Sequence, residues 1–144
     1  MIIDEHGIVT GLPLHDSHLA RLNYDGIDLH VTLRTEGGHS RVELHEVKKS
    51  GFIGFRLNAI LSEIFAWRVE CVPEGVLNMN DGAWNTLLVG IYSDSENLRS
   101  QVAQIQRDLK GSFLVQFNFS YGGSFAAICS DIKAEDVGLI AKDQ

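Results

Sequence analysis

Histidines are concentrated in the first third of the chain, where all six lie within 45 residues. His15 and His18 enclose Asp16, and two imidazoles with one carboxylate are a ligand set that zinc accepts. On a strand, residues three apart point to opposite faces, so this set converges only where a turn or helix begins. Asp16 and Ser17 also fit a turn closed by side-chain to backbone hydrogen bonds. We prefer the turn and keep a metal site at His15, Asp16 and His18 as the alternative.

A second histidine group depends on the register of two adjacent hairpins. If the Gly37–Gly38 dipeptide forms a two-residue loop, His30 faces His45 across the hairpin and Glu43 lies one step along the diagonal. Two imidazoles beside a carboxylate could bind a transition metal or form a pH-sensitive pair. The preceding hairpin, however, places Arg21 opposite His30, where its positive charge would repel a cation. We therefore interpret this group as part of an exposed polar face.

The sequence contains no motif that predicts catalysis. His45 and Glu46 begin a pattern used by zinc proteases, but Lys49 stands where the second histidine is needed. There is no Gly-x-Ser-x-Gly element, and Gly51 and Gly54 match neither a dinucleotide-binding nor a phosphate-binding loop. We expect a non-enzymatic protein with no catalytic residue, no cofactor and no bound metal.

The composition is that of one globular domain. The chain has 144 residues, of which 44% are apolar and 22% charged, and we expect residues 1–144 to form a single domain. No apolar run reaches the roughly 18–20 residues that span a bilayer. The first residues contain neither the basic segment nor the long apolar segment of a secretory signal, so we expect a cytoplasmic protein.

The charge of the chain narrows the expected partners. The 19 acidic residues outnumber the 12 lysines and arginines, which gives a net charge of −7. Nucleic acids and anionic membranes are bound through clustered lysine and arginine, and the largest cluster here is Lys48–Lys49. We therefore expect neither nucleic acid nor membrane as a partner. An acidic domain attracts basic proteins, and exposed edge strands also allow a homodimer.

The two cysteines, Cys71 and Cys129, are expected to be free thiols. Disulfides are rare in the reducing compartment that the missing signal implies. Alternation along the segment from Phe65 places Cys71 on the core face of a strand, and it places Cys129 on a less buried face opposite to Ile128. With this pattern the two sulfur atoms do not face each other.

Alternation with a period of two predicts a three-stranded antiparallel meander in the first third of the chain. Apolar and polar residues alternate along 27–35, as is typical of a strand with one buried face. The Asp25–Gly26 dipeptide between 19–24 and 27–35 predicts a tight type I′ hairpin. The next turn, at Gly37–Gly38, leads into a third strand over 41–47.

Further strands are predicted in the middle of the chain. We expect a short strand at 52–55 and another at 60–69, where β-branched and aromatic residues favour a strand although the apolar spacing also permits a helix. The apolar run 86–91, which follows a loop at 78–82, is typical of a central strand. Together with the next helix and strand it would form a right-handed crossover unit.

One amphipathic helix and a C-terminal hairpin complete the predicted fold. A narrow apolar stripe at helical spacing follows a cap at Ser93 or Ser95. The strand 113–120 then turns at Gly122–Gly123 into a last strand over 125–132. The predicted fold class is α+β, a mainly antiparallel sheet (meander plus C-terminal hairpin) with one amphipathic helix packed on it.

Two short segments of the chain are similar to segments of a known set of proteins. Residues 12–17, Leu-Pro-Leu-His-Asp-Ser, lead directly into the meander, and residues 120–123, Ser-Tyr-Gly-Gly, precede a short strand that carries Cys129. This arrangement resembles small, mostly uncharacterised bacterial proteins that include immunity-protein-like members of polymorphic toxin systems. The resemblance implies a strand-rich, non-enzymatic protein that acts through a protein partner, and it carries over no catalytic residue. The residues that it singles out are His15, Asp16, Tyr121, Gly122 and Gly123.

The sequence thus predicts a cytoplasmic protein-interaction module that is immunity-protein-like and acts on a protein partner with a basic surface. The alternative is a small metal- or ligand-binding protein that uses the N-terminal histidine cluster, His15, Asp16 and His18. These two predictions differ in what the protein binds, a basic protein in the first and a metal ion or small ligand in the second.

Overall fold

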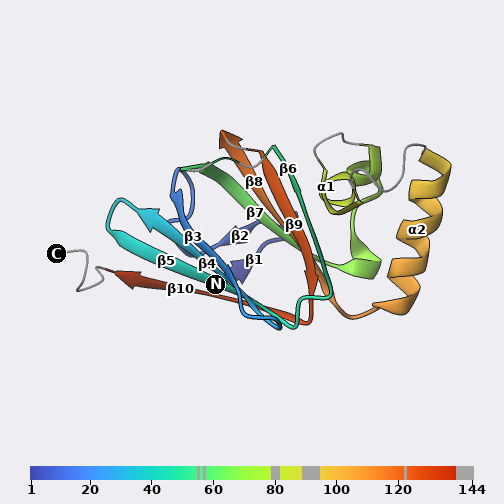
Figure 1. Cartoon of the computed structure of the whole chain (residues 1–144), viewed down its shortest axis with the longest axis horizontal. Coiled ribbons are helices and arrows are strands. Elements are labelled where there is room, and N and C mark those ends of the chain that lie inside the picture. Colours follow the sequence, from blue (N-terminus) through green and yellow to red (C-terminus); the bar gives the residue numbers. More distant parts are fainter. Residues whose placement is uncertain (55, 57, 79–81, 89–94, 122, 139–144) are drawn as a thin grey trace.

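The structure is a computed structural model that describes residues 1–54, 56, 58–78, 82–88, 95–121 and 123–138. Over these residues the chain forms a large bent sheet, with the helices gathered at one end of the molecule (Figure 1). The strands are β1 (Ile2–Ile3), β2 (Val9–Thr10), β3 (His18–Tyr24), β4 (Leu29–Thr35), β5 (Gly38–His45), β6 (Lys49–Ile53), β7 (Ile60–Arg68), β8 (Phe113–Tyr121), β9 (Ser124–Cys129) and β10 (Asp131–Gly138). The α-helices are α1 (Ala83–Leu88) and α2 (Ser95–Asp108), and the 3-10 helices are η1 (Val69–Cys71) and η2 (Glu74–Asn78). The predicted α+β fold is confirmed.

Eight strands form one sheet in the order β10-β5-β4-β3-β7-β8-β9-β6, and β1 pairs with β2 in a small second sheet. All pairings between these strands of the described chain are antiparallel. Strands β5 and β6 follow each other across a bend at residues 46–48, and they pair with β10 and β9 respectively. The pairing of β5 with β10 ends at His45 and Asp131, and the pairing of β6 with β9 begins at Lys49 and Ile128. We call the bend at residues 46–48 the corner.

The predicted meander is confirmed as β3-β4-β5, but its first hairpin has a longer loop than expected. Tyr24 pairs with Leu29, so residues 25–28 form a four-residue loop where the Asp-Gly signal predicted a two-residue turn. The Asp25 carboxylate accepts hydrogen bonds from two backbone N–H groups of the loop, which closes it in this longer form.

The second hairpin of the meander is also displaced from its predicted register. Thr35 pairs with Gly38, so the two-residue loop is Glu36 and Gly37 instead of Gly37 and Gly38. This displacement changes the cross-strand partner of each residue by two positions, so every side chain remains on its predicted face of the sheet. The apolar residues of β4 and β5 are accordingly buried, and the polar residues between them are partly exposed.

Two hydrophobic clusters stabilise the fold. The inner cluster joins the two halves of the bent sheet and includes Val31, Leu44 and Phe117. The outer cluster lies where helices cover β8 and β9, and it includes Trp84 of α1 and Val102 of α2. Strand β9 contributes side chains to both clusters, so all six of its residues are buried.

The strand predicted at 86–91 is wrong, because its first residues belong to helix α1 and residues 89–91 lie outside the described part of the chain. A short, wholly apolar run does not distinguish a central strand from a buried helix. Helix α1 packs on β6 and β9. Gly51 of β6 permits this contact, since a Cβ atom there would overlap the carbonyl oxygen of Thr86. Because residues 86–88 are helical, the predicted strand is not found among the described residues and the crossover unit that depended on it is not supported.

The other predicted elements are found with shifted ends. The strand at 60–69 is confirmed as β7, the strand at 52–55 begins earlier as β6, and 125–132 is divided between β9 and β10. The amphipathic helix is confirmed as α2. Its predicted cap Ser93 and most of the loop expected at 78–82 lie outside the described residues, and the alternative cap Ser95 is the first residue of α2. No described helix combines the length and apolar character needed to cross a bilayer.

Both cysteines are free, but their burial is the reverse of the prediction. Strand β7 ends at Arg68 and the chain continues as η1, so the alternation of the strand does not extend to Cys71, which is exposed. Cys129 is fully buried because both faces of β9 are covered. This burial, with the nearby charge of Asp131, raises the pKa of the Cys129 thiol to about 12.

Candidate functional site: a chain of carboxylates and imidazoles

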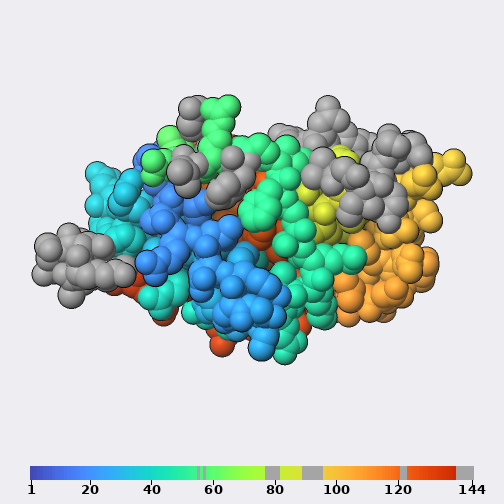
Figure 2. Space-filling view, viewed as in Figure 1, coloured from blue at the N-terminus to red at the C-terminus, as the bar shows by residue number. Residues whose placement is uncertain are grey.

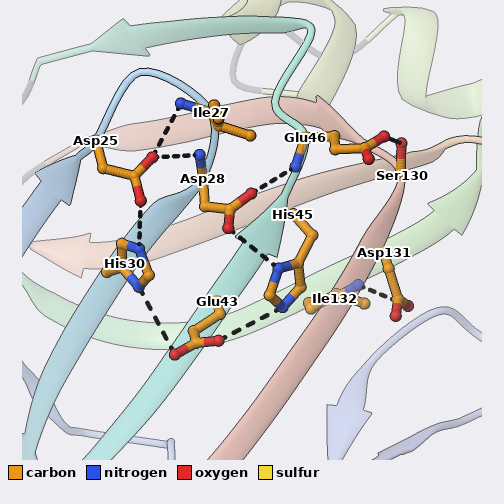
Figure 3. Close-up of polar contacts among 10 residues, drawn as sticks. All are labelled: Asp25, Ile27, Asp28, His30, Glu43, His45, Glu46, Ser130, Asp131 and Ile132. Carbon is orange, nitrogen blue, oxygen red and sulfur yellow. Dashed lines mark hydrogen bonds and ion pairs between the residues drawn. The ribbon is translucent and has the colours of Figure 1, made fainter.

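Five side chains from the meander form a continuous polar chain on the outer face of the sheet (Figure 3). Carboxylates and imidazoles alternate along it in the order Asp25, His30, Glu43, His45 and Asp28. The four oxygen–nitrogen distances, in that order, are 3.1, 3.6, 3.4 and 3.4 Å. Glu43 is the central link and directs one oxygen toward each imidazole. We call these five residues the acid–histidine chain.

The register of β4 and β5 positions the three central members. His30 pairs directly with Glu43, and His45 lies two residues further along β5. Because alternate residues of a strand share one face, all three side chains point away from the inner cluster, to which Val31 and Leu44 belong. Adjacent strands lie about 4.8 Å apart, which brings cross-strand side chains into contact range.

The loop at residues 25–28 and the corner fix the two ends of the acid–histidine chain, Asp25 and Asp28. One oxygen of Asp25 accepts hydrogen bonds from the N–H groups of Asp28 at 2.7 Å and Ile27 at 2.9 Å. These two bonds, followed by the contact with His30, lower the pKa of Asp25 to about 2. Asp28 in turn accepts a hydrogen bond at 2.9 Å from the N–H group of Glu46 in the corner.

The acid–histidine chain keeps a negative charge in every protonation state of its imidazoles. With ionised carboxylates, its charge is −3 when both imidazoles are neutral and −1 when both are protonated. Its side chains are between 26% and 45% exposed, so a partner can reach them. The exposed carboxylate of Glu46, which accepts a hydrogen bond from the Ser130 hydroxyl at 2.8 Å, adds to this negative surface.

The arrangement is suited to holding a cationic group. Carboxylates accept charge-assisted hydrogen bonds from lysine and arginine side chains, and partial burial strengthens such bonds. The ligand atoms of Asp25, Asp28 and His30 lie within 4.8 Å of one another, the one such group of three in the part of the chain that is described. A metal ion there would have to displace the contact between Asp25 and His30 and compete with backbone N–H groups for the oxygens.

The structure brings His30, Glu43 and His45 together as predicted, but the cross-strand pairs differ from the predicted ones. His30 faces Glu43 instead of His45, because the hairpin loop is Glu36–Gly37. Arg21 pairs with Thr32 and not with His30, since the first loop is two residues longer than predicted. The sequence argument against a cation, which depended on Arg21 opposite His30, therefore does not hold.

The alternative metal ligands His15, Asp16 and His18 do not form a three-ligand group of this kind among the described residues. His15 Nδ1 lies 3.1 Å from a carboxylate oxygen of Asp16, and both side chains are about three-quarters exposed. His18 begins β3, where it pairs with Ile60. Asp16 adopts a left-handed backbone with φ of 62°, and the Ser17 hydroxyl donates a hydrogen bond to a backbone carbonyl, so this segment is a turn.

The residues singled out near the second hairpin have structural positions. Tyr121 ends β8, and Gly122 lies outside the described residues. Gly123 has φ of 91° and lies against β6, where a Cβ atom would overlap the carbonyl oxygen of Ile53. A glycine is therefore required at this position by both the backbone conformation and the close approach.

Sequence reasoning missed the two ends of the acid–histidine chain, Asp25 and Asp28. The sequence predicts Asp25 as part of a tight turn and predicts no contact of its side chain. Asp28 lies two residues before His30 on the predicted polar face, so the alternation along 27–35 already placed the two on the same side. That shared face was the signal that could have identified Asp28.

Comparisons of the chain with protein-family models, with curated proteins and with solved structures found no match. The function is therefore inferred from the geometry and charge of the site.

Proposed function

We propose that the protein is a non-enzymatic, cytoplasmic interaction module that binds a partner protein with a basic surface through the acid–histidine chain. The observation that carries the proposal is that the partly exposed acid–histidine chain contains three carboxylates and only two imidazoles. Because imidazole protonation cannot neutralise all three carboxylates, a negative charge always remains to attract a lysine or arginine side chain.

The charge of the whole protein supports this proposal. A net charge of −7 attracts a basic partner over a distance and speeds the encounter of the two proteins. The acid–histidine chain then provides fixed hydrogen-bond acceptors for docking. The acceptors are held by the backbone hydrogen bonds of the loop and corner, so little ordering is needed when a partner binds. The resemblance of residues 12–17 and 120–123 to proteins that include immunity-protein-like members favours the same kind of function.

The proposal is tested with a fluorescein-labelled oligolysine peptide, whose binding is followed by fluorescence anisotropy. Glu43→Gln removes the central carboxylate and is expected to weaken binding about fivefold, as befits one partly exposed ion pair. The matched control is Asp108→Asn on α2, which removes an equal charge from an exposed site elsewhere and is expected to leave affinity nearly unchanged. Equal losses in both variants would mean that the peptide responds only to net charge, which contradicts the proposal.

A metal ion at Asp25, Asp28 and His30 is the second candidate, because their ligand atoms converge. A metal that binds only the folded state stabilises it by mass action and so raises the melting temperature. At a metal concentration one hundred times the dissociation constant, the free energy of unfolding increases by about 2.7 kcal/mol. Zinc or manganese would have to raise the melting temperature of the native chain but not of Asp28→Asn. Light scattering on the same samples tests whether the protein forms a homodimer.

A further inference from the structure

An apolar pocket opens beside the corner, and it is distinct from the acid–histidine chain. It has a volume of about 450 Å³ and lies between β3, β6 and the corner. Leu22 and Leu29 line its wall, while Tyr24 and Phe52 line it with side chains that are 55% and 42% exposed. Figure 2 shows this side of the molecule, with a hollow between the blue atoms of β3 and the green-blue atoms of β6. We call it the β3–β6 pocket.

The pocket exists because two strand edges in its walls are unpaired. Among the described residues, β3 pairs with β7 only at His18–Ile60, where the Leu19 N–H donates to the Ala59 carbonyl, so no described strand pairs with residues 20–24 on that edge. Strand β6 is the last strand of the sheet, and its outer edge is open as well. The pocket lies where these two edges approach each other without pairing, and this leaves an entrance to the interior of the bent sheet.

The interior side of the pocket is aromatic and continuous with the core. The ring centroid of Phe125 lies 4.7 Å from that of Phe52 and 5.8 Å from that of Phe117. Phe117 and Phe125 belong to the inner cluster. An apolar group that enters the pocket therefore meets a preformed apolar surface, and its burial contributes about 25 cal/mol per Å² of area removed from water.

The other lining residues add positive charge to this apolar pocket. Lys48 and Lys49 line it, and no carboxylate of the described residues does so. Neither lysine forms an ion pair with a described carboxylate; Lys48 Nζ instead donates a hydrogen bond at 3.0 Å to the Ser112 hydroxyl. In a protein with a net charge of −7, two adjacent lysines that form no ion pair with a described carboxylate place positive charge at this pocket.

We propose that the β3–β6 pocket binds an amphipathic carboxylate, a small molecule with an apolar chain or ring and one carboxylate group. The apolar part enters between β3 and β6 and contacts Phe52 and Phe125. The carboxylate remains at the entrance and pairs with Lys49, while Lys48, whose Nζ donates to the Ser112 hydroxyl, adds positive charge beside it. Ligand sites are commonly pockets of this size, mostly apolar, with a few polar groups that fix the orientation of the ligand.

Isothermal titration calorimetry with decanoate, below its micelle concentration, tests the proposal on the full chain. Decanoate is expected to bind, while decyltrimethylammonium, which has the same chain and the opposite charge, is expected to bind at least tenfold more weakly. The double variant Lys48→Gln, Lys49→Gln should lose roughly tenfold in decanoate affinity through the loss of charge-assisted contacts. The matched control Lys110→Gln, exposed on the segment after α2, should bind decanoate like the native chain.

A separate variant tests the location of the ligand. Phe52→Ser removes a partly exposed aromatic side chain, which the fold tolerates better than a change at a buried ring. It should weaken decanoate binding while the circular dichroism spectrum stays native. No decanoate binding, equal binding of both head groups, or binding that is unaffected by the changes at Phe52 and at the two lysines would overturn the proposal. None of these outcomes depends on the acid–histidine chain.

Discussion

Replacing Gly51 by alanine tests how closely helix α1 packs on β6. Gly51 does not have a left-handed backbone, so alanine adds no backbone strain there. Its Cβ atom would overlap the carbonyl oxygen of Thr86 and lie 2.9 Å from that of Leu87. Both oxygens belong to the backbone of α1 and cannot rotate away as a side chain can. The helix must therefore shift, and the outer cluster must repack around it.

The expected cost of Gly51→Ala is that of overpacking, about 2 kcal/mol within a usual range of about 1–3 kcal/mol. At roughly 4 °C per kcal/mol, differential scanning calorimetry should show a melting temperature lower by about 8 °C. The matched control is Gly37→Ala, because a Cβ atom at Gly37 would meet no atom within 4 Å and its backbone is not left-handed. That variant should melt at or slightly above the native temperature. Equal melting temperatures of the two variants would refute the close packing of α1 on β6.

Three further results are expected. The exposed thiol of Cys71 should react rapidly with Ellman's reagent, whereas Cys129, buried and with a pKa of about 12, should react only after unfolding. In urea titrations at neutral pH, Asp25→Asn should have a lower free energy of unfolding than the native chain. Because folding lowers the pKa of Asp25 from 3.8 to about 2, this difference should disappear as the pH falls from about 4 to about 2. Ser124→Ala should lower the free energy of unfolding in urea by about 1–3 kcal/mol, because it removes the buried hydroxyl that accepts a hydrogen bond from Thr86.

The meander was predictable because one of its faces is buried and the other is wet. Alternation along β4 and β5 therefore appears directly in the sequence, and it also placed His30, Glu43 and His45 on one face. The loop lengths were not predictable in the same way. The longer first loop depends on hydrogen bonds that the Asp25 carboxylate makes to the backbone, and an Asp-Gly dipeptide is compatible with both loops.

The covered part of the sheet was harder to predict, because burial on two sides removes the alternation. All six residues of β9 are buried, so alternation cannot indicate that Cys129 faces the core. Helix α1 is enclosed to a similar degree, with five of its six residues buried, so its apolar run has the pattern of a buried strand. Strand β10 was missed over 133–138, where exposed charged residues at an edge carry little apolar pattern.

The bent pairing of β5–β6 with β9–β10 has a consequence for how the protein folds. Its register joins His45 to Asp131 and Lys49 to Ile128, residues far apart along the chain, whereas the meander needs only neighbouring segments. Bringing distant segments together loses conformational entropy before any stabilising contact forms. We therefore expect β9 and β10 to pair with β6 and β5 after the meander has formed. We expect refolding kinetics in the range of milliseconds to seconds, as for other topologies rich in non-local strand pairs.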